Sequence, residues 1–334
     1  MITISEPPKP IEGNLEDRPS SLGILNKLPA ELLYVALSDL DFLTLTRFSR
    51  VSVRARNILR SLPAYQDLMK HAPDALAALS QTKLLHLHSA CDLHAALRTE
   101  CCATCLEYGA YLFLPTCERC CWQCLRSNLT RRVISPAAAG RIFALSPKMV
   151  QQLPIMFSIP GAYGVGRKPA QTSHKLVSVG AAKKLAVSKY KSLANLKEVI
   201  ARRKPSRQNA NTIKYLEAVF LDYAHSDPLM VPDNGGIGDD PYFGMASIPF
   251  PFLPTRDVVD FGLWCKGCQW IYEQMKSQRL PAHLIANMVP VGCDPHRVLL
   301  GLFRRGHTRI GLLEHIRSCY GVRKLLREEQ VEGY

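Results

Sequence analysis

Apolar side chains recur at helical spacing along the first patterned part of the chain. After Pro29, a good residue for the first turn of a helix, the stripe runs through Leu32, Leu33, Ala36, Leu37 and Leu40. Two shorter helical patterns follow, and Asp41 and Ser52 stand where each would need an N-cap. The pattern predicts three small helices in about 40 residues. So short a segment cannot bury this many leucines within itself, so part of the stripe is expected to face a partner.

Composition narrows the class of protein. The chain has 334 residues, 47% of them apolar, which is enough for a core and more typical of several modules than of one. Its first residues carry prolines and acids where a secretory signal needs a basic start and an apolar run. No apolar run approaches the roughly 20 residues that cross a bilayer. We therefore expect a cytoplasmic or nuclear protein without a membrane partner. Disulfides are disfavoured in those compartments, so the twelve cysteines point to metal.

The densest group of cysteines lies at residues 101–124. Structural zinc takes four ligands in a tetrahedron, and a C-x2-C turn presents two sulfurs from one loop. The C-x2-C-x15-C-x2-C spacing typical of a four-cysteine zinc module selects Cys102, Cys105, Cys121 and Cys124. Cys117 and Cys120 form an alternative second pair with a shorter spacer, and spacing alone does not choose between the pairs. The segment EYGAYLFLP between them predicts a strand or hairpin over the metal.

A second candidate site is spread over the C-terminal part of the chain. A C-x2-C-x46-H-x3-C pattern joins Cys265, Cys268, His315 and Cys319. The last two are four residues apart and therefore share one face of a helix expected over residues 309–328. Cys293 and His296 offer an alternative C-x2-H pair. Together the two sites predict about two structural zinc ions, each held by four protein ligands.

These patterns predict a mainly α fold, in which a small three-helix unit precedes an α-rich region with two small zinc-stapled modules. The expected organisation is a disordered tail at 1–20, the three-helix unit at 21–70, a helical segment with the first zinc module at 71–132, a helical region at 133–224, a Pro/Gly-rich loop at 225–255 and the second zinc module at 256–334.

The N-terminal motifs resemble those of the F-box family. Leu28-Pro29, Glu31-Leu32-Leu33 and Arg50-Val51-Ser52 stand where an F-box has its L-P-x-E-L-L and R-x-V-S elements, and the similarity covers about residues 25–68. The whole arrangement resembles fungal F-box proteins with cysteine-rich C-terminal parts. The resemblance implies docking onto the Skp-type adaptor and cullin of an SCF-type ubiquitin ligase, with the rest of the chain selecting an unknown protein substrate. The implied docking residues are Leu28, Pro29, Leu32, Leu33, Leu43, Leu45 and Val51.

The charge leaves a second interpretation open. Lysine and arginine exceed aspartate and glutamate by 42 to 28, and residues 183–207 concentrate this excess beside an apolar stripe, which predicts a basic amphipathic helix. A nucleic-acid-binding zinc protein could contact phosphates through Lys183, Lys184, Lys189, Lys191, Arg202, Arg203 and Lys204. Neither interpretation needs an enzyme, because a zinc ion with four protein ligands has no open position for a reacting water, and we expect a non-catalytic adaptor.

Overall fold

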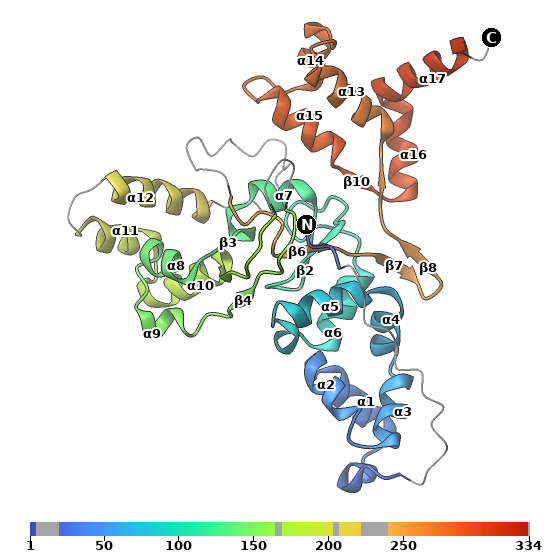
Figure 1. Cartoon of the computed structure of the whole chain (residues 1–334), viewed down its shortest axis with the longest axis vertical. Coiled ribbons are helices and arrows are strands. Elements are labelled where there is room, and N and C mark those ends of the chain that lie inside the picture. The colour runs from blue at the N-terminus through green and yellow to red at the C-terminus, as the bar shows by residue number, and fades with distance from the viewer. Residues whose placement is uncertain (5–19, 164–168, 203–206, 222–239, 333–334) are drawn as a thin grey trace.

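The computed structural model describes residues 1–4, 20–163, 169–202, 207–221 and 240–332. Within these residues the architecture is helix-rich, with small antiparallel sheets of two or three strands between the helices, so the predicted mainly α class is confirmed. Figure 1 shows the N-terminal helices (blue) and the C-terminal helices (red) at opposite ends of the molecule, with a small sheet between them. Among the described residues, no helix is both long enough and apolar enough to span a membrane.

The first helices lie where the apolar pattern predicts them. A 3₁₀ turn and three short helices follow one another as η1 (Gly23–Lys27), α1 (Ala30–Ser38), α2 (Phe42–Phe48) and α3 (Val53–Ser61). Both predicted N-caps form. The Asp41 carboxylate accepts a hydrogen bond from Thr44 N–H at 2.8 Å, and the Ser52 hydroxyl accepts one from Ala55 N–H at 3.0 Å. These bonds satisfy donors that a helix start leaves unpaired, so even short helices begin at defined residues.

The next helices extend the same core. They are α4 (Pro63–His71), α5 (Pro73–Gln81) and α6 (Ala90–Arg98), with the 3₁₀ turn η2 (Leu85–Leu87) between the last two. Leu59 of α3, Leu68 of α4 and Leu93 of α6 are all fully buried in one hydrophobic cluster. The first three helices therefore share a continuous core with the helices that follow, which explains how so short a segment buries part of its leucines.

A three-stranded sheet holds the middle of the chain. Its order is β2-β1-β6, and its strands are β1 (Tyr111–Phe113), β2 (Glu118–Cys120) and β6 (Ser247–Pro249). The turn after β2 leads into α7 (Trp122–Ser127) and η3 (Leu129–Arg131). Arg119 in β2 is 2% exposed and donates to the carbonyls of Ala96 at 3.1 Å and Phe250 at 3.2 Å, and also to those of Gly109 and Pro251. One buried cation, satisfied by several carbonyls, thus ties α6 to both edges of the sheet.

Described residues between Leu129 and Phe220 build a second hydrophobic cluster. A sheet of order β3-β5-β4 contains β3 (Val133–Ile134), β4 (Met156–Phe157) and β5 (Lys175–Ser178). The helices are α8 (Pro136–Ile142), α9 (Pro147–Val150), α10 (Val179–Tyr190), α11 (Leu193–Ala201) and α12 (Arg207–Phe220). Phe143, Leu196 and Leu216 are buried between them.

The C-terminal region has its own small core. The region begins with the hairpin of β7 (Phe252–Thr255) and β8 (Val258–Asp260), whose Leu253 is buried in the first, larger cluster, and it also contains the pair of β9 (Leu263–Trp264) with β10 (Gly306–His307). Its helices are α13 (Lys266–Lys276), α14 (Ala282–Met288), α15 (Pro295–Phe303), α16 (Arg309–Ser318) and α17 (Tyr320–Glu332). Three of the eight buried residues of this core are cysteines.

Two segments predicted to lack regular structure are partly ordered. Ile2, in the predicted disordered tail, is 1% exposed, and its N–H donates to the Ser247 carbonyl of β6 at 2.9 Å. Residues 5–19 lie outside the described residues. The predicted loop at 225–255 contains the strands β6 and β7 from residue 247 onward. Residues 222–239 lie outside the part of the chain that the structure describes. The loop prediction was wrong there because β6 is an edge strand, and edges tolerate proline.

Two predicted helices are interrupted. The basic segment forms α10 and α11 rather than one helix, because Lys191 takes a left-handed conformation with φ of 65° and Ser192 caps a new helix by accepting from Asn195 N–H at 3.2 Å. Residues 203–206 are outside the described part of the chain. The helix expected over 309–328 breaks at Cys319, whose backbone is extended, so that α16 and α17 are separate.

Candidate metal centres and docking helices

The first cysteine cluster is assembled by the β1–β2 hairpin. Cys102 and Cys105 lie in the turn before β1, Cys121 is the N-cap of α7, and Cys124 lies in the first turn of that helix. The hairpin brings the two turns together, and the four sulfurs lie within 4.8 Å of one another. The sulfurs of Cys105 and Cys121 are 3.6 Å apart. We call these four residues the first tetrad.

Hydrogen-bond donors favour ionised sulfur in the first tetrad, whereas burial opposes it. Thr104 N–H donates to the Cys102 sulfur at 3.5 Å, and Cys124 N–H donates to the Cys121 sulfur at 3.3 Å. The hydrogen bond with Cys105, followed by those with the other thiols, lowers the pKa of Cys102, whereas the bond with Cys102 raises the pKa of Cys124. One ionised sulfur therefore opposes the ionisation of its neighbours, and a divalent cation is the species that would let all four ionise.

The remaining cysteines of this run lie outside the first tetrad. Cys117 is buried, and burial raises the pKa of its thiol to about 12, so the thiol stays neutral near pH 7. Cys120 is fully buried and donates to the Glu118 carbonyl at 3.7 Å. The structure thus brings together the preferred pairs and does not bring the alternative pair, Cys117 and Cys120, into the same four-sulfur group.

The second cluster joins two segments that are distant in the sequence. Cys265 is the N-cap of α13 and Cys268 lies in its first turn, while His315 belongs to α16 and Cys319 ends that helix. The Cys319 sulfur is 3.7 Å from that of Cys265 and 4.0 Å from that of Cys268, and the Cys268 sulfur is 3.2 Å from His315 Nε2. All four ligand atoms lie within 4.8 Å of one another. We call these residues the second tetrad.

The alternative ligands for this cluster are used elsewhere. Cys293 is half-buried against the C-terminal core, and His296 Nε2 lies 3.0 Å from the Tyr272 hydroxyl. Neither residue joins the four ligand atoms that gather around Cys268. His307 instead stacks on the His315 ring, with centroids 4.9 Å apart, and this ring contact helps to orient the imidazole of the second tetrad. Sequence spacing did not indicate the contribution of His307.

Two glycines let the segments of the second tetrad approach each other. A Cβ added to Gly267, inside the C-x2-C turn, would lie 2.3 Å from Val322 N, and one added to Gly321 would lie 2.1 Å from the Gly267 carbonyl oxygen. Real Cβ atoms do not come this close to backbone, so the start of α13 packs directly on the start of α17. This contact places Cys319 beside Cys265.

Both tetrads have the dimensions of a small tetrahedral metal site. With metal–sulfur bonds of about 2.3 Å, tetrahedral geometry separates neighbouring sulfurs by about 3.8 Å, close to the 3.6 Å and 3.7 Å observed for one pair in each cluster. Each tetrad could therefore hold one metal ion. Four protein ligands would close the coordination sphere, so such an ion would cross-link the chain rather than present a reactive water.

Apolar side chains of α1 and its flanking turns face solvent. The exposed fraction is 58% for Leu32 and 62% for Val35, two residues three apart on the same helix. Other exposed apolar residues of this region are Ile24, Leu28 and Val51. We call these five residues the docking face. Surfaces of this kind commonly mark a protein–protein contact.

Comparison with known families identifies this region. Residues 25–67 match the family model of the F-box domain. The match contains α1, α2 and α3 in full, and confirms the resemblance seen in the sequence motifs. No curated protein and no solved structure matches the chain.

The F-box residues predicted to dock divide into exposed and buried sets. The exposed residues are Leu28, Pro29, Leu32 and Val51, and Leu43 is half-buried. Leu33 and Leu45 are 7% and 0% exposed and belong to the core, so their predicted part in docking stays a prediction. A match to a sequence motif does not determine whether a leucine lies on the exposed or the buried face of a helix. Ile24 and Val35 are further exposed apolar residues that the motifs did not single out, although the three-residue spacing of Leu32 and Val35 was a usable signal.

The basic segment offers a broken charged surface. Lys184, Lys189 and Lys191 are exposed. Lys183 is turned inward, where its ammonium donates to the Val219 carbonyl at 3.0 Å, and Arg202 is paired with Glu198 at 2.6 Å. The last two predicted phosphate contacts, Arg203 and Lys204, lie outside the described residues.

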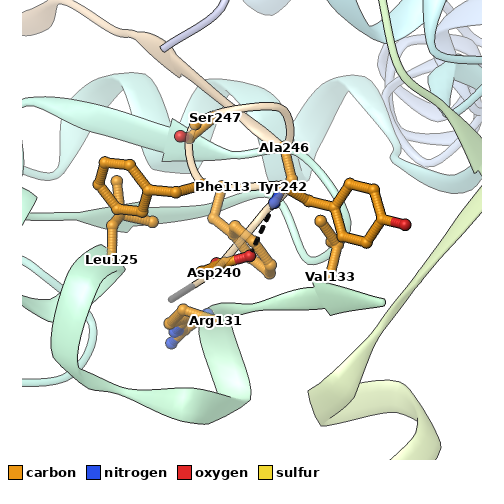
Figure 2. Close-up of a pocket in the computed structure, with 10 residues that line it drawn as sticks. Phe113, Leu125, Arg131, Val133, Asp240, Tyr242, Ala246 and Ser247 are labelled. Carbon is orange, nitrogen blue, oxygen red and sulfur yellow. Dashed lines mark hydrogen bonds between the residues drawn. The ribbon is translucent and has the colours of Figure 1, made fainter. Parts of the chain in front are cut away.

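A small hollow opens beside the central sheet (Figure 2). It is lined by side chains from several elements, including Phe113, Arg131, Val133 and Asp240, and its volume is about 10 Å³. The Asp240 carboxylate accepts a hydrogen bond from Tyr242 N–H at 2.9 Å. The hollow has room for about one water molecule, so it is a packing defect rather than a site for a substrate.

Proposed function

We propose that this chain is the substrate-recognition subunit of an SCF-type cullin–RING ubiquitin ligase. Its F-box would bind a Skp-type adaptor and thereby reach the cullin, while the rest of the chain recruits an unknown protein substrate. The observation that carries this proposal is the docking face, because Leu32 and Val35 are exposed on a helix that matches the F-box model, with Leu28 and Val51 exposed in the matched turns beside it.

Burial of the docking face would provide the driving force. Removing a leucine or valine side chain from water is worth about 1.5–3 kcal/mol when burial is complete. Leu32 and Val35 are more than half exposed, so most of that gain is still available to a partner. The contact would be largely apolar and therefore only weakly sensitive to salt.

The proposed role needs no bond-making group in this chain. Holding a lysine-bearing substrate near a charged ubiquitin carrier raises the effective concentration of the two reactants. The four-ligand geometry of both tetrads supports this reading, because a closed metal site is structural. We therefore propose a non-catalytic adaptor.

We further propose that each tetrad holds zinc, which gives about two ions per chain. Thiolate and imidazole ligands in a tetrahedral arrangement suit zinc, since the ion has no preference of its own for a more open geometry. The first tetrad offers four sulfurs, and the second offers three sulfurs and one ring nitrogen.

A pull-down with purified Skp-type adaptor tests the docking face. Wild-type chain should retain the adaptor, and the Leu32→Ala, Val35→Ala double variant should bind at least tenfold more weakly because it removes apolar contact area. Leu33 is left intact, since truncating a core leucine costs about 2–5 kcal/mol and would confuse unfolding with loss of binding.

The matched control carries equivalent truncations elsewhere. Leu313 and Leu326 are 51% and 54% exposed on α16 and α17, so their double alanine variant removes similar area outside the F-box. It should bind the adaptor like wild type. Failure of the wild-type chain to bind at all would contradict the proposed function.

A nucleic-acid-binding role is the second candidate, and the exposed lysines at 184, 189 and 191 favour it. Phosphate binding releases counterions, so affinity for an oligonucleotide would fall steeply between low and moderate salt. Salt-resistant binding of the adaptor combined with no oligonucleotide binding would exclude this candidate.

A further inference from the structure

A large groove lies between the F-box and the helices that follow it. Its lining comes from α2 and α3, from α4 and α5, and from Arg256 and Asp257 in the turn between β7 and β8. Its volume is about 980 Å³, near the upper end of the range usual for binding sites of about 300–1,000 Å³. None of the five residues of the docking face lines it.

The floor of the groove is apolar. Leu59 and Leu76 are buried there, and Met69 lies beside them. The rings of Phe42 and Tyr65 stack on each other, with centroids 5.2 Å apart and planes 9° apart. The stacked pair adds apolar ring surface, so the floor suits an aliphatic or aromatic side chain.

Positive charge surrounds this floor. The cationic residues that line the groove are Arg50, Arg56, Arg60, Lys70 and Arg256. Lys70 and Arg256 are exposed, and neither forms an ion pair with another residue of the described ranges. The Nε of Arg56 donates to the Ser49 carbonyl at 3.3 Å, which holds that side chain beside the groove.

Only one of the two acidic residues in the lining can offset this charge. Asp67 is already engaged, since its carboxylate lies 2.9 Å from His94 Nε2 and 3.1 Å from Arg98 Nη2. Asp257, in the turn between β7 and β8, is exposed. Lys70 and Arg256 therefore bring exposed positive charge to a lining with one available carboxylate, and the groove is complementary to a negatively charged partner.

We propose that this groove binds an acidic peptide segment of a partner protein. An apolar side chain of the peptide would occupy the floor, and flanking carboxylates would pair with the cationic rim. Naming that partner as the ligase substrate rests on the proposed function, whereas the binding itself does not. A peptide held here would lie next to the docking helices, which keeps it close to the ligase.

Fluorescence anisotropy with designed peptides tests the proposal. The probe is a short fluorescein-labelled peptide in which aspartates and glutamates flank a central Leu-Phe pair. Full-length wild-type protein should bind it, and the Lys70→Glu, Arg256→Glu variant should bind at least tenfold more weakly. Both positions lie outside the matched F-box residues, so the variant should still bind the Skp-type adaptor, and the two proposals fail separately.

Controls assign the binding to the groove. The Lys184→Glu, Lys189→Glu variant makes the same change in net charge on α10 and should retain wild-type affinity. The same peptide with lysines replacing the acids, or with serines replacing Leu-Phe, should bind at least tenfold more weakly. Equal affinity of both charge-reversal variants, undiminished binding of the serine peptide, or displacement of the probe by single-stranded oligothymidylate would overturn the proposal.

Discussion

The two tetrads differ in how much other structure surrounds them. The first is embedded in the largest hydrophobic cluster, where α1–α6 and the central sheet pack together, and three of its own cysteines are members of that cluster. The second belongs to a core of eight buried residues, of which three are its cysteines. The first tetrad therefore supplies a small share of a large core, whereas the second tetrad supplies a large share of a small core.

The ligands also close loops of different length. In the first tetrad they span residues 102–124, whereas in the second they span 265–319. Closing a longer loop removes more conformational freedom from the unfolded chain, although the dependence on length is weak. Because the second tetrad has a smaller core and closes a longer loop, an ion bound there should stabilise its region more than an ion at the first tetrad stabilises its own.

Removal of a ligand from the second tetrad should have the largest effect. Cys268→Ser is expected to lose one zinc ion and to unfold α13, α16 and α17, because structural zinc is worth about 10–16 kcal/mol in small zinc-binding peptides. The number of zinc ions bound per chain, measured by metal analysis, should fall from about two to about one. Hydrogen exchange should show loss of protection across these helices. Retained protection after loss of the ion would show that packing alone holds the region.

The corresponding change in the first tetrad sharpens the comparison. Cys124→Ser should also lose one ion, with exchange increased around residues 101–124 but with protection retained in the buried parts of α4 and α6. Adaptor binding should survive both serine variants, since the docking face lies within residues 24–51, apart from both tetrads. Global unfolding of Cys124→Ser would contradict the view that its core is independent of the metal.

An intermediate effect is expected at the glycine contact. Gly321→Ala would place a Cβ 2.1 Å from the Gly267 carbonyl oxygen, forcing α17 away from α13 at a cost of about 1–3 kcal/mol, typical of overpacking. A thermal melt followed by circular dichroism should show the loss of stability, with about two zinc ions retained. In Gly311→Ala the only near atom would be the Thr308 side-chain hydroxyl oxygen at 3.3 Å, and because alanine also favours a helix interior, this control should melt no lower than wild type.

The smallest effect is expected for a cysteine outside the tetrads. Cys117→Ala should retain about two zinc ions and lose only about 1 kcal/mol, as for a modest core truncation. Native mass spectrometry reports the ion count directly. Loss of one ion would show that Cys117 and Cys120 supply the second pair, contrary to the arrangement of sulfurs in the structure.

Features that depend on neighbours along the chain were predictable. Asp41 and Ser52 cap helices at the expected positions because the donor and acceptor of an N-cap are only a few residues apart. The C-x2-C turns of the first tetrad follow the same logic, with backbone donors reaching a sulfur two or three residues away. Local geometry of this kind is encoded within a single turn.

Features that depend on distant contacts were not predictable in the same way. Leu33 and Leu45 carry F-box motif letters but face inward, since helices α4–α6 build the core against which they pack. The strand β6 was hidden in a proline-rich segment because its partner, β1, lies more than a hundred residues earlier. The sequence spacing predicted a single helix over residues 309–328 for the last two ligands of the second tetrad. The chain instead turns at Cys319, where Gly267 packs closely on Gly321.

The sequence by itself determined the short helices with their caps, the F-box motifs and the two sets of ligand-bearing turns, since each is a pattern of residues within about one helical turn. The tertiary structure decided which leucines are exposed, which cysteines meet, and where five cations gather around an apolar groove. The physical reason is that burial, metal geometry and surface charge are properties of groups brought together in space, and the free energy of bringing them together is shared across the whole core.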